Sequence, residues 1–427
     1  MLTAIIIIFI IGYTAIVFEQ NIKIDKAAVA LITGVLCWVL YAFSPTPIDT
    51  IEHHLIDKFA KSAQILFFLL GAMTIVELID AHEGFDIIVS RLKTRKKVSL
   101  LWIIGILSYL LSSVLDNLTT TIVMISFIRK LVNDREDKLL FASMIVIAAN
   151  AGGAWSPIGD VTTTMLWIGK QVTTSKLMEY VFLPSIICLL VPLTVISFKM
   201  TGDLEPIEVE NDDKVRVDSL SERHKTAVFF LGIGALMFVP IFKTITHLPP
   251  FMGMLLSLGV MWAITELMHS DKDHDDKTAL SVKSALERVD TPSIMFFVGI
   301  LLAVGALEST GILRGCAEWL TQTIGNQSVI AVVIGLISAV VDNVPLVAAS
   351  MGMYSMEQFP QDDMFWHLIA YCAGTGGSIL IIGSAAGVAA MGMERIVFFW
   401  YVKKISLLAA LGYFAGAAAF ILEHHIF

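Results

Sequence analysis

The feature that most constrains this chain is a succession of apolar stretches, each near the roughly 20 residues that a helix needs to cross a bilayer. Of its 427 residues, 56% are hydrophobic and only 16% are charged. Because a backbone inside hydrocarbon must satisfy its own hydrogen bonds, such stretches fold as helices. The sequence therefore predicts an all-α polytopic membrane protein and excludes a water-soluble domain.

Ten of these stretches are predicted to cross the membrane, five in each half of the chain. The first half contributes Leu2 to Val17, Ala28 to Phe43, Ser62 to Ile79, Phe141 to Trp167 and Val181 to Phe198. The second half contributes Ala227 to Phe242, Phe251 to Leu267, Ser293 to Leu307, Leu368 to Met391 and Ile405 to Leu422. Between the third and fourth crossings of each half lies a shorter helix pair, 98–128 and 329–354. The amphipathic stretch Ile51 to Ala60 is predicted to form a separate short helix on the outer surface.

Each helix pair carries an Asp-Asn dipeptide at its bend, Asp116-Asn117 in the first and Asp342-Asn343 in the second. A carboxylate in the membrane interior costs about 3 kcal/mol on insertion scales, so its presence indicates an ion or proton path. The arm from Leu118 to Ile128 reaches only about 16 Å before Arg129-Lys130 stops it. We therefore predict two re-entrant hairpins whose tips lie near the midplane.

Lysine and arginine are distributed unevenly over the predicted loops. With both termini outside, 23 of the 29 cationic side chains lie in inward-facing loops, as the positive-inside rule requires. Five crossings per half then place the second half in the membrane with the opposite orientation. This arrangement predicts two inverted repeats, residues 1–200 and 226–427, joined by an acidic cytoplasmic linker over 201–225.

The crossing that follows each hairpin is interrupted by glycines. The run from Asn150 to Asp160 contains Gly-Gly, Ser-Pro and Gly-Asp within the crossing 141–167, and the run from Gly374 to Ser384 interrupts 368–391. Glycines at this density favour unwinding, which frees carbonyl oxygens to coordinate a cation. Side-chain oxygens beside the breaks and the first hairpin tip would complete an oxygen-rich site: Thr119, Thr120, Asn150, Thr162, Thr163, Ser378 and Ser384.

Simpler explanations compete with this interpretation. Asp and Asn favour helix N-caps, so the dipeptides and Asp160 could serve as caps alone, although a neutral Ser would cap without placing a charge in the membrane. The paired glycines could be contacts between helices. Glu77 and Asp80 lie at the cytoplasmic end of the third crossing, where they face either the interface or the site. The four cysteines are scattered singly, which offers neither a disulfide framework nor a zinc spacing, and the net charge of −9 suggests no nucleic-acid partner.

Together these motifs resemble the NhaD-type sodium/proton antiporters of the ion transporter superfamily. The resemblance rests on Ser112 to Thr120, Asn150 to Thr163 and Ser338 to Pro345, and it covers nearly the whole chain. It implies a scaffold domain that forms a homodimer and a transport domain that moves elevator-fashion, in a bacterial inner membrane, with activity favoured at alkaline pH. By matching position, the family's important polar residues fall on Asp116, Asn117, Asn150, Asp160, Thr162, Thr163, Ser338, Asp342 and Asn343.

We therefore predict a secondary transporter, not an enzyme, that exchanges sodium or lithium for protons and carries no cofactor. Asp116 and Asp342, with Asp160, would bind either the cation or protons, while Asn117, Asn343 and the threonines supply neutral oxygens. The position that matches Asp160 in the second half is Ser384, so the site cannot be symmetric. The sequence fixes neither the choice among sodium, lithium and potassium nor the number of protons exchanged.

Two other functions agree with part of the pattern. A carboxylate or oxyanion transporter of the same superfamily would share the hairpins. It would need neutral tips or cations, however, and the motifs contain three acids with no Lys or Arg. An intramembrane aspartyl protease also needs two membrane aspartates, but it does not predict two inverted hairpins with matched Asp-Asn tips.

Overall fold

The computed structural model describes residues 1–85, 87, 94, 96–204, 221–269 and 280–426. Seven described helical stretches are long and apolar enough to cross a membrane, which agrees with a polytopic membrane protein. They are α4 (Ile48–Ala81), α8 (Arg135–Ala154), α10 (Thr174–Lys199), α11 (Glu222–Thr246), α12 (Pro250–Met268), α15 (Thr291–Ser309) and the stretch Phe398–His424. That last stretch joins α21 (Phe398–Tyr401), a π-helical turn (Val402–Ser406) and α22 (Leu407–Ile426).

The three remaining predicted crossings are also helical. Two of them, α1 (Leu2–Val17) and α3 (Lys26–Ala42), have 16 and 17 residues, and the third is broken into α19 (Met364–Gly376) and α20 (Ala385–Glu394). A second break separates α8 from α9 (Val161–Ile168). The predicted helix pairs are α6 (Lys97–Ser112) with α7 (Asn117–Arg129), and α17 (Gln327–Ile337) with α18 (Asn343–Met353). Short helices α2 (Glu19–Ile22), α14 (Val282–Arg288) and α16 (Ile312–Ile324) connect these elements.

Two predictions about local structure were wrong or incomplete. The surface helix predicted over Ile51 to Ala60 is the first part of the continuous helix α4, because no Gly or Pro separates it from the third crossing. The helix α16, which is bent by 118° from α17, was not predicted. Of the predicted linker 201–225, residues 205–220 lie outside the described residues, and the last four residues, from Glu222, already belong to α11.

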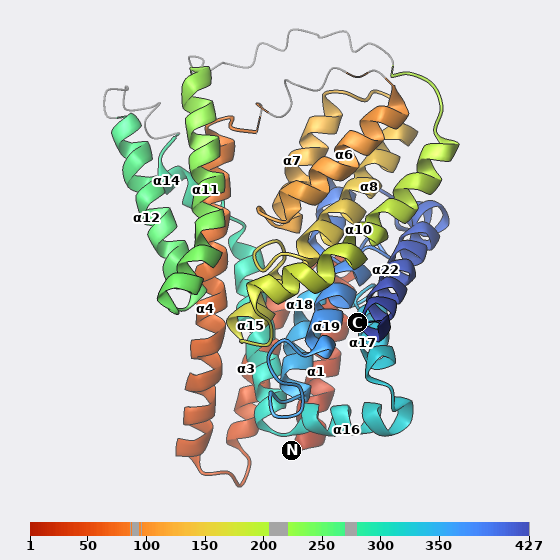
Figure 1. Ribbon diagram of the computed structural model, residues 1–427. Helices are drawn as coiled ribbons and strands as arrows, with labels where there is room; N and C mark the ends of the chain where they lie inside the picture. The colour runs from red at the N-terminus through yellow and green to blue at the C-terminus, as the bar shows by residue number, and fades with distance from the viewer. Residues whose placement is uncertain (86, 88–93, 95, 205–220, 270–279, 427) are drawn as a thin grey trace.

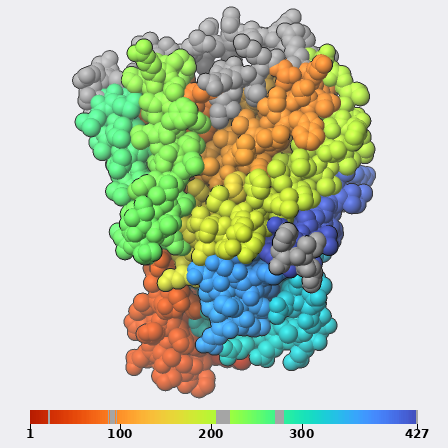
Figure 2. Space-filling model, viewed as in Figure 1, coloured from red at the N-terminus to blue at the C-terminus, as the bar shows by residue number. Residues whose placement is uncertain are grey.

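The helices pack in two groups (Figure 1). In the first group, α3 crosses α15, and α4, α11 and α12 pack beside them. The crossing is close, since a Cβ atom on Gly34 would lie 2.5 Å from the carbonyl oxygen of Gly299. Only 22% of the apolar window of α11 is buried, so this helix faces outward; with α12 it forms the green flank in Figure 2.

The second group contains both hairpins and both broken helices, with α10 and α22 packed against them. Its centre is α8, whose apolar window is 89% buried. The helix α7 contacts α20, α9 contacts α18 and α8 contacts α19, so segments from the two halves of the sequence interleave. Figure 1 shows α6 and α7 in the upper part of the molecule and α17 in the lower part.

Equivalent contacts hold each hairpin against its broken helix. The Ser112 hydroxyl donates to the carbonyl oxygen of Ala149 at 2.6 Å, and the Ser338 hydroxyl donates to that of Ala373 at 3.0 Å. In both places a glycine of the broken helix lies directly on a hairpin carbonyl, since a Cβ on Gly376 would be 2.0 Å from the Gly335 oxygen. These matched contacts bring both hairpin tips to the helix breaks.

Candidate functional site

Four helices begin at the place where hairpin tips and helix breaks meet. Each starts with a side-chain cap: Asp116 on α7, Asp160 on α9, Asp342 on α18 and Ser384 on α20. The Asp160 carboxylate, for example, accepts from the Thr162 backbone N–H at 2.8 Å. The three aspartates are therefore caps, as the simpler explanation predicted, Ser384 is a fourth cap, and the helix dipoles favour negative charge at each of these positions. Capping does not account for the other contacts of these residues.

Asp160 lies at the centre of the site and is 2% exposed. Its Oδ2 accepts from Asn117 Nδ2 at 2.7 Å and from Asn343 Nδ2 at 3.2 Å. The Thr162 hydroxyl donates to Oδ1 at 2.9 Å. One buried carboxylate is thus contacted by the asparagines of both hairpins, and charge-assisted bonds of this kind are about twice as strong as neutral ones.

Asn150 extends this arrangement across to the second break. It is fully buried, and its Oδ1 accepts from Asn117 Nδ2 at 2.9 Å. Its Nδ2 donates to the hydroxyls of Ser378 and Ser384, each at 2.9 Å. We call this set the Asp160 network; it contains Asp160, Asn117, Asn343, Asn150, Thr162, Ser378 and Ser384.

The hairpin carboxylates lie beside the network without a hydrogen bond to Asp160. Both oxygens of Asp116 are engaged by Thr119, the backbone N–H at 2.7 Å and the hydroxyl at 2.9 Å. The backbone of Asp116 has φ +116°, which a residue other than glycine rarely adopts, and such strain is concentrated at functional sites. Asp342 accepts from the Val344 N–H at 3.2 Å.

Besides Asp116, Asp342 and Thr119, three further predicted site residues lie outside the network. The Thr163 hydroxyl donates to the carbonyl oxygen of Asp160 at 2.9 Å, and Ser338 holds the hairpin contact to Ala373 described above. The Thr120 hydroxyl is buried and has no hydrogen-bond partner in the part of the chain that the structure describes. Thr163 and Ser338 thus bond backbone carbonyl oxygens at the edge of the site.

A small inner cavity of about 50 Å³ brings the three acids together. Asp116, Asp160 and Asp342 all line it, along with Asn117. A site of this size accommodates a small ion or about one water molecule, whose share of liquid volume is ≈ 30 Å³. The predicted convergence of the three carboxylates is thus present in the geometry, with Asp160 and not the hairpin aspartates at its centre.

A wide cavity of about 510 Å³ leads to the inner cavity from one side. It follows α7 from Leu118 to Lys130, and it shares Leu118, Ser293 and Ala385 with the inner cavity. Five acidic residues line it, including Glu77 and Asp80, against three cationic ones. Cations from this side therefore meet a wall with an excess of acidic groups.

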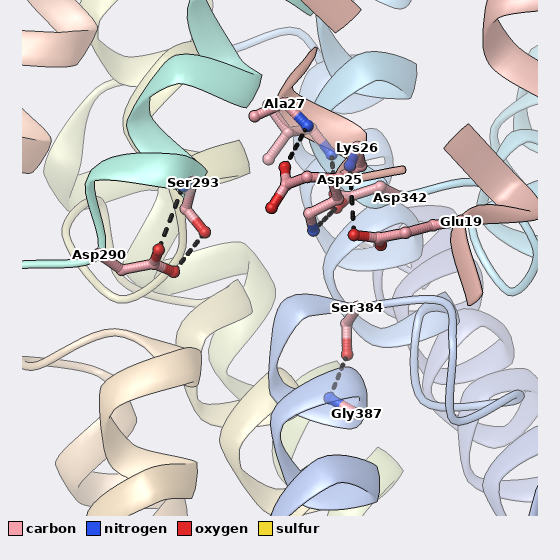
Figure 3. A network of polar contacts seen from close by, with 10 residues as sticks. Glu19, Asp25, Lys26, Ala27, Asp290, Ser293, Asp342, Ser384 and Gly387 are labelled. Atoms are coloured by element: carbon pink, nitrogen blue, oxygen red, sulfur yellow. Dashed lines mark hydrogen bonds and ion pairs between the residues drawn. The ribbon is translucent and has the colours of Figure 1, made fainter. Parts of the chain in front are cut away.

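Sequence reasoning missed one residue of the site. Lys26 lines both cavities, and its Nζ lies 4.0 Å from Oδ2 of Asp342 (Figure 3). The prediction that no Lys or Arg lies at the site was therefore wrong. The predicted crossings end at Val17 and begin again at Ala28, which leaves Lys26 in a loop, but it begins α3, beside the tip of the second hairpin. Its position in the first turn of a helix, where the dipole disfavours a cation, was the available signal.

Comparison with known proteins places this geometry in context. The sequence model of a family described as "Citrate transporter" matches residues 13–374. The chain is 49% identical over 423 residues to Sodium/proton antiporter 1 of Arabidopsis thaliana, covering 99% of this chain and 73% of that protein. It is 30% identical over 444 residues to the Na(+)/H(+) antiporter NhaD of Alkalimonas amylolytica, covering 97% of this chain and 89% of the relative.

The NhaD protein of Vibrio cholerae is likewise 30% identical, over 455 residues, with 99% of this chain and 92% of the relative covered. The matches to the three antiporters extend over both hairpins and both helix breaks, and thus over the whole Asp160 network, whereas the family model ends before Ser378 and Ser384. The chain therefore belongs to the NhaD-type sodium/proton antiporters, within the broader family whose description is "Citrate transporter".

Proposed function

We propose that this protein exchanges sodium, and also lithium, for protons, and that Asp160 is the central carboxylate of the exchange. The observation that carries the proposal is the contact of Asn117 and Asn343, one from each hairpin, with the buried Asp160. Asp116 and Asp342 line the same cavity and would share the cation or the protons. The antiporter names of the relatives support the same exchange.

The coupling follows from the cost of a desolvated charge. A buried carboxylate is stable when a cation neutralises it or when it is protonated. As sodium enters from the wide cavity, one or more protons leave the carboxyl groups for that cavity; as protons bind, sodium leaves. Rotation of the Asn117 and Asn343 amides would turn their oxygens toward the cation in place of the nitrogens that now donate to Asp160. Sodium and protons then occupy one site in turn.

We propose that the chain consists of two inverted repeats, 1–200 and 226–427, and that the second helix group moves as a transport domain against the first. The matched contacts of Ser112 and Ser338 support the repeat. A site with several uncompensated charges would be costly to carry through hydrocarbon, whereas a sodium-loaded or protonated site would not. Because of that difference in cost, the transport domain would move only with sodium or protons bound, which couples the two fluxes. The first group, with its α3–α15 crossing, would form the scaffold and the homodimer contact.

The test is transport in everted membrane vesicles that contain a pH-sensitive dye. Sodium added to vesicles with a preformed acid interior is expected to collapse the proton gradient. Asp160→Asn is expected to abolish this response, because a neutral amide can neither bind the cation by charge nor release a proton. Asp363→Asn is the matched control, since Asp363 also caps a broken helix, α19, but among the described residues its carboxylate accepts from its own helix, at the Phe365 N–H. A sodium response that persists in Asp160→Asn would contradict the proposal.

Carboxylate transport is the second candidate, because the family description names citrate and Lys26 lies at the site. Three carboxylates line the inner cavity with that one ammonium, so an anion would meet net negative charge. We expect no uptake of radiolabelled citrate or succinate by the vesicles with or without sodium. Saturable uptake of either acid would favour the second candidate.

A further inference from the structure

Lys26 occupies the junction of three cavities. It lines the wide cavity, the inner cavity and a third cavity of about 450 Å³ that Asp342 also lines. Its ammonium lies 4.7 Å from the centre of the Phe296 ring and 4.0 Å from Asp342 Oδ2. The side chains of Lys26 and Asp342 are 23% and 15% exposed, so their interaction is shielded from bulk water.

The helix that carries Lys26 does not need its charge. Asp25 caps α3 by accepting from the Ala27 N–H at 2.7 Å, and Glu19 accepts from the Lys26 N–H at 3.2 Å. A cation in the first turn opposes the helix dipole and is a net cost to α3. The attraction of Asp342, which approaches from the second hairpin, offsets this cost (Figure 3).

The two hairpin aspartates differ in a way that explains this pairing. Asp116 receives two bonds from Thr119, but the position equivalent to Thr119 in the second hairpin is Pro345, which has neither a backbone N–H nor a hydroxyl. Asp342 Oδ2 is therefore left to face Lys26. The residue that matches Lys26 in the second half is Pro250, so the sequence provides no corresponding lysine for Asp116.

We propose that the Lys26 ammonium pairs with the Asp342 carboxylate as a tethered counter-cation when sodium is not bound. Sodium must displace this ammonium in order to bind. The distance between the ammonium and Asp342 is what changes in the cycle. This inference rests on the proposed sodium/proton exchange and deepens it. Lys26 would act as a specificity-determining residue, because it fixes how much negative charge the sodium-free site carries and how strongly a cation must bind to enter.

The test compares three variants in the everted-vesicle assay over a range of sodium concentrations. Lys26→Met keeps the apolar stem against Phe296 and removes the charge. We expect its half-maximal sodium concentration to fall about fivefold or more, because a competing unit charge some 4 Å from the site is lost. Its maximal rate should fall as well, because sodium release is slower. Lys26→Arg should retain values near those of the unchanged protein.

Lys23→Met is the matched control, since it removes the same charge from the same α1–α3 connection at an exposed position. It should leave the half-maximal sodium concentration unchanged. An increase or no change of that concentration in Lys26→Met, with normal membrane insertion, would overturn the inference. A loss of the response in the unchanged protein would instead overturn the proposed function, so the two failures are distinguishable.

Pro345→Thr provides a second route that leaves Lys26 in place. The new N–H and hydroxyl would engage Asp342 as Thr119 engages Asp116, and they would compete with the ammonium. We expect the half-maximal sodium concentration to fall in this variant too, by less than in Lys26→Met. If Lys26→Met does not insert, a Pro345→Thr protein with an unchanged sodium dependence would contradict the inference.

Discussion

At the scale of single residues, the site divides its work between adjacent positions of each Asp-Asn dipeptide. The aspartate is the N-cap, so its carboxylate folds back onto its own helix, whereas the asparagine is the first helical residue and its side chain is free to reach outward. Asn117 and Asn343 consequently meet Asp160, while Asp116 and Asp342 line the cavity beside it. The sequence predicted which residues converge. It could not predict which carboxylate lies at the centre of the site, because that depends on where each helix begins.

The asparagine contacts lead to a prediction about cation affinity. Asn117→Ala and Asn343→Ala are each expected to raise the half-maximal sodium concentration about tenfold or more, because each removes the amide oxygen that the proposed rotation turns toward the cation, and a polar contact to a charged group contributes ≈ 1.5–3 kcal/mol. Titration of the vesicle response with sodium measures the change. Asn326→Ala, at the exposed N-cap of α17, is the control and should behave as the unchanged protein. Equal sodium dependence in all three variants would argue against the asparagines as site residues.

At the scale of elements, the paired glycines of the first broken crossing do not themselves form the unwound segment, as glycine density alone would predict. Gly152 and Gly153 belong to the last turn of α8, and the unwound residues are those from Trp155 to Asp160. Gly152 lies on the hairpin, because a Cβ there would be 2.1 Å from the carbonyl oxygen of Tyr109. The alternative interpretation, that paired glycines are helix contacts, thus describes part of their role. Glycine density indicated that the crossing breaks, but the packing partner depends on the tertiary fold.

This close packing makes Gly376→Ala a specific test of the element contacts. The added methyl group would meet the Gly335 carbonyl oxygen at 2.0 Å, and backbone atoms cannot move aside as a flexible side chain does. We expect a destabilisation of about 1–3 kcal/mol, seen as a lower midpoint of thermal unfolding in detergent. Gly234→Ala in α11 is the control, because no described atom outside the backbone of its own helix lies within 4 Å of its added Cβ. A midpoint in Gly376→Ala equal to that of Gly234→Ala would contradict the contact.

At the scale of the whole molecule, the positions of the crossings and the hairpins were predictable from apolar length and charge. The position of the α1–α3 connection was not predictable. The helix α1 has only 16 residues, and the position of Lys26 depends on how far that helix reaches. Contacts between the halves away from the site were also not predictable. Arg129 at the end of α7, predicted as a stop signal, pairs with Glu394 of α20 at 2.5 Å and joins the first hairpin to the second broken helix.

The one-sided wide cavity predicts a directional pattern of chemical labelling. In a Cys316→Ser background, which removes the one exposed native thiol, Ser126→Cys lines the wide cavity. A membrane-impermeant thiol reagent should modify it from the cytoplasmic side. Ser355→Cys, in the cavity between α16 and α18, should react from the opposite side. The reverse pattern, measured in everted and right-side-out vesicles, would overturn the proposed orientation and the outside location of both termini.

The unbroken helix α4 has a consequence for the lipid around the protein. Its 34 residues extend about 51 Å, well beyond the roughly 30 Å of a hydrocarbon core, and its first part forms the lower end of the molecule in Figure 2. Ile56 and Phe59 are exposed there among charged neighbours. A bilayer with longer acyl chains would draw those charges toward the hydrocarbon, whereas one with shorter chains would favour a larger tilt of the helix. Membrane thickness is therefore expected to change the tilt of α4 and of the helices packed along it.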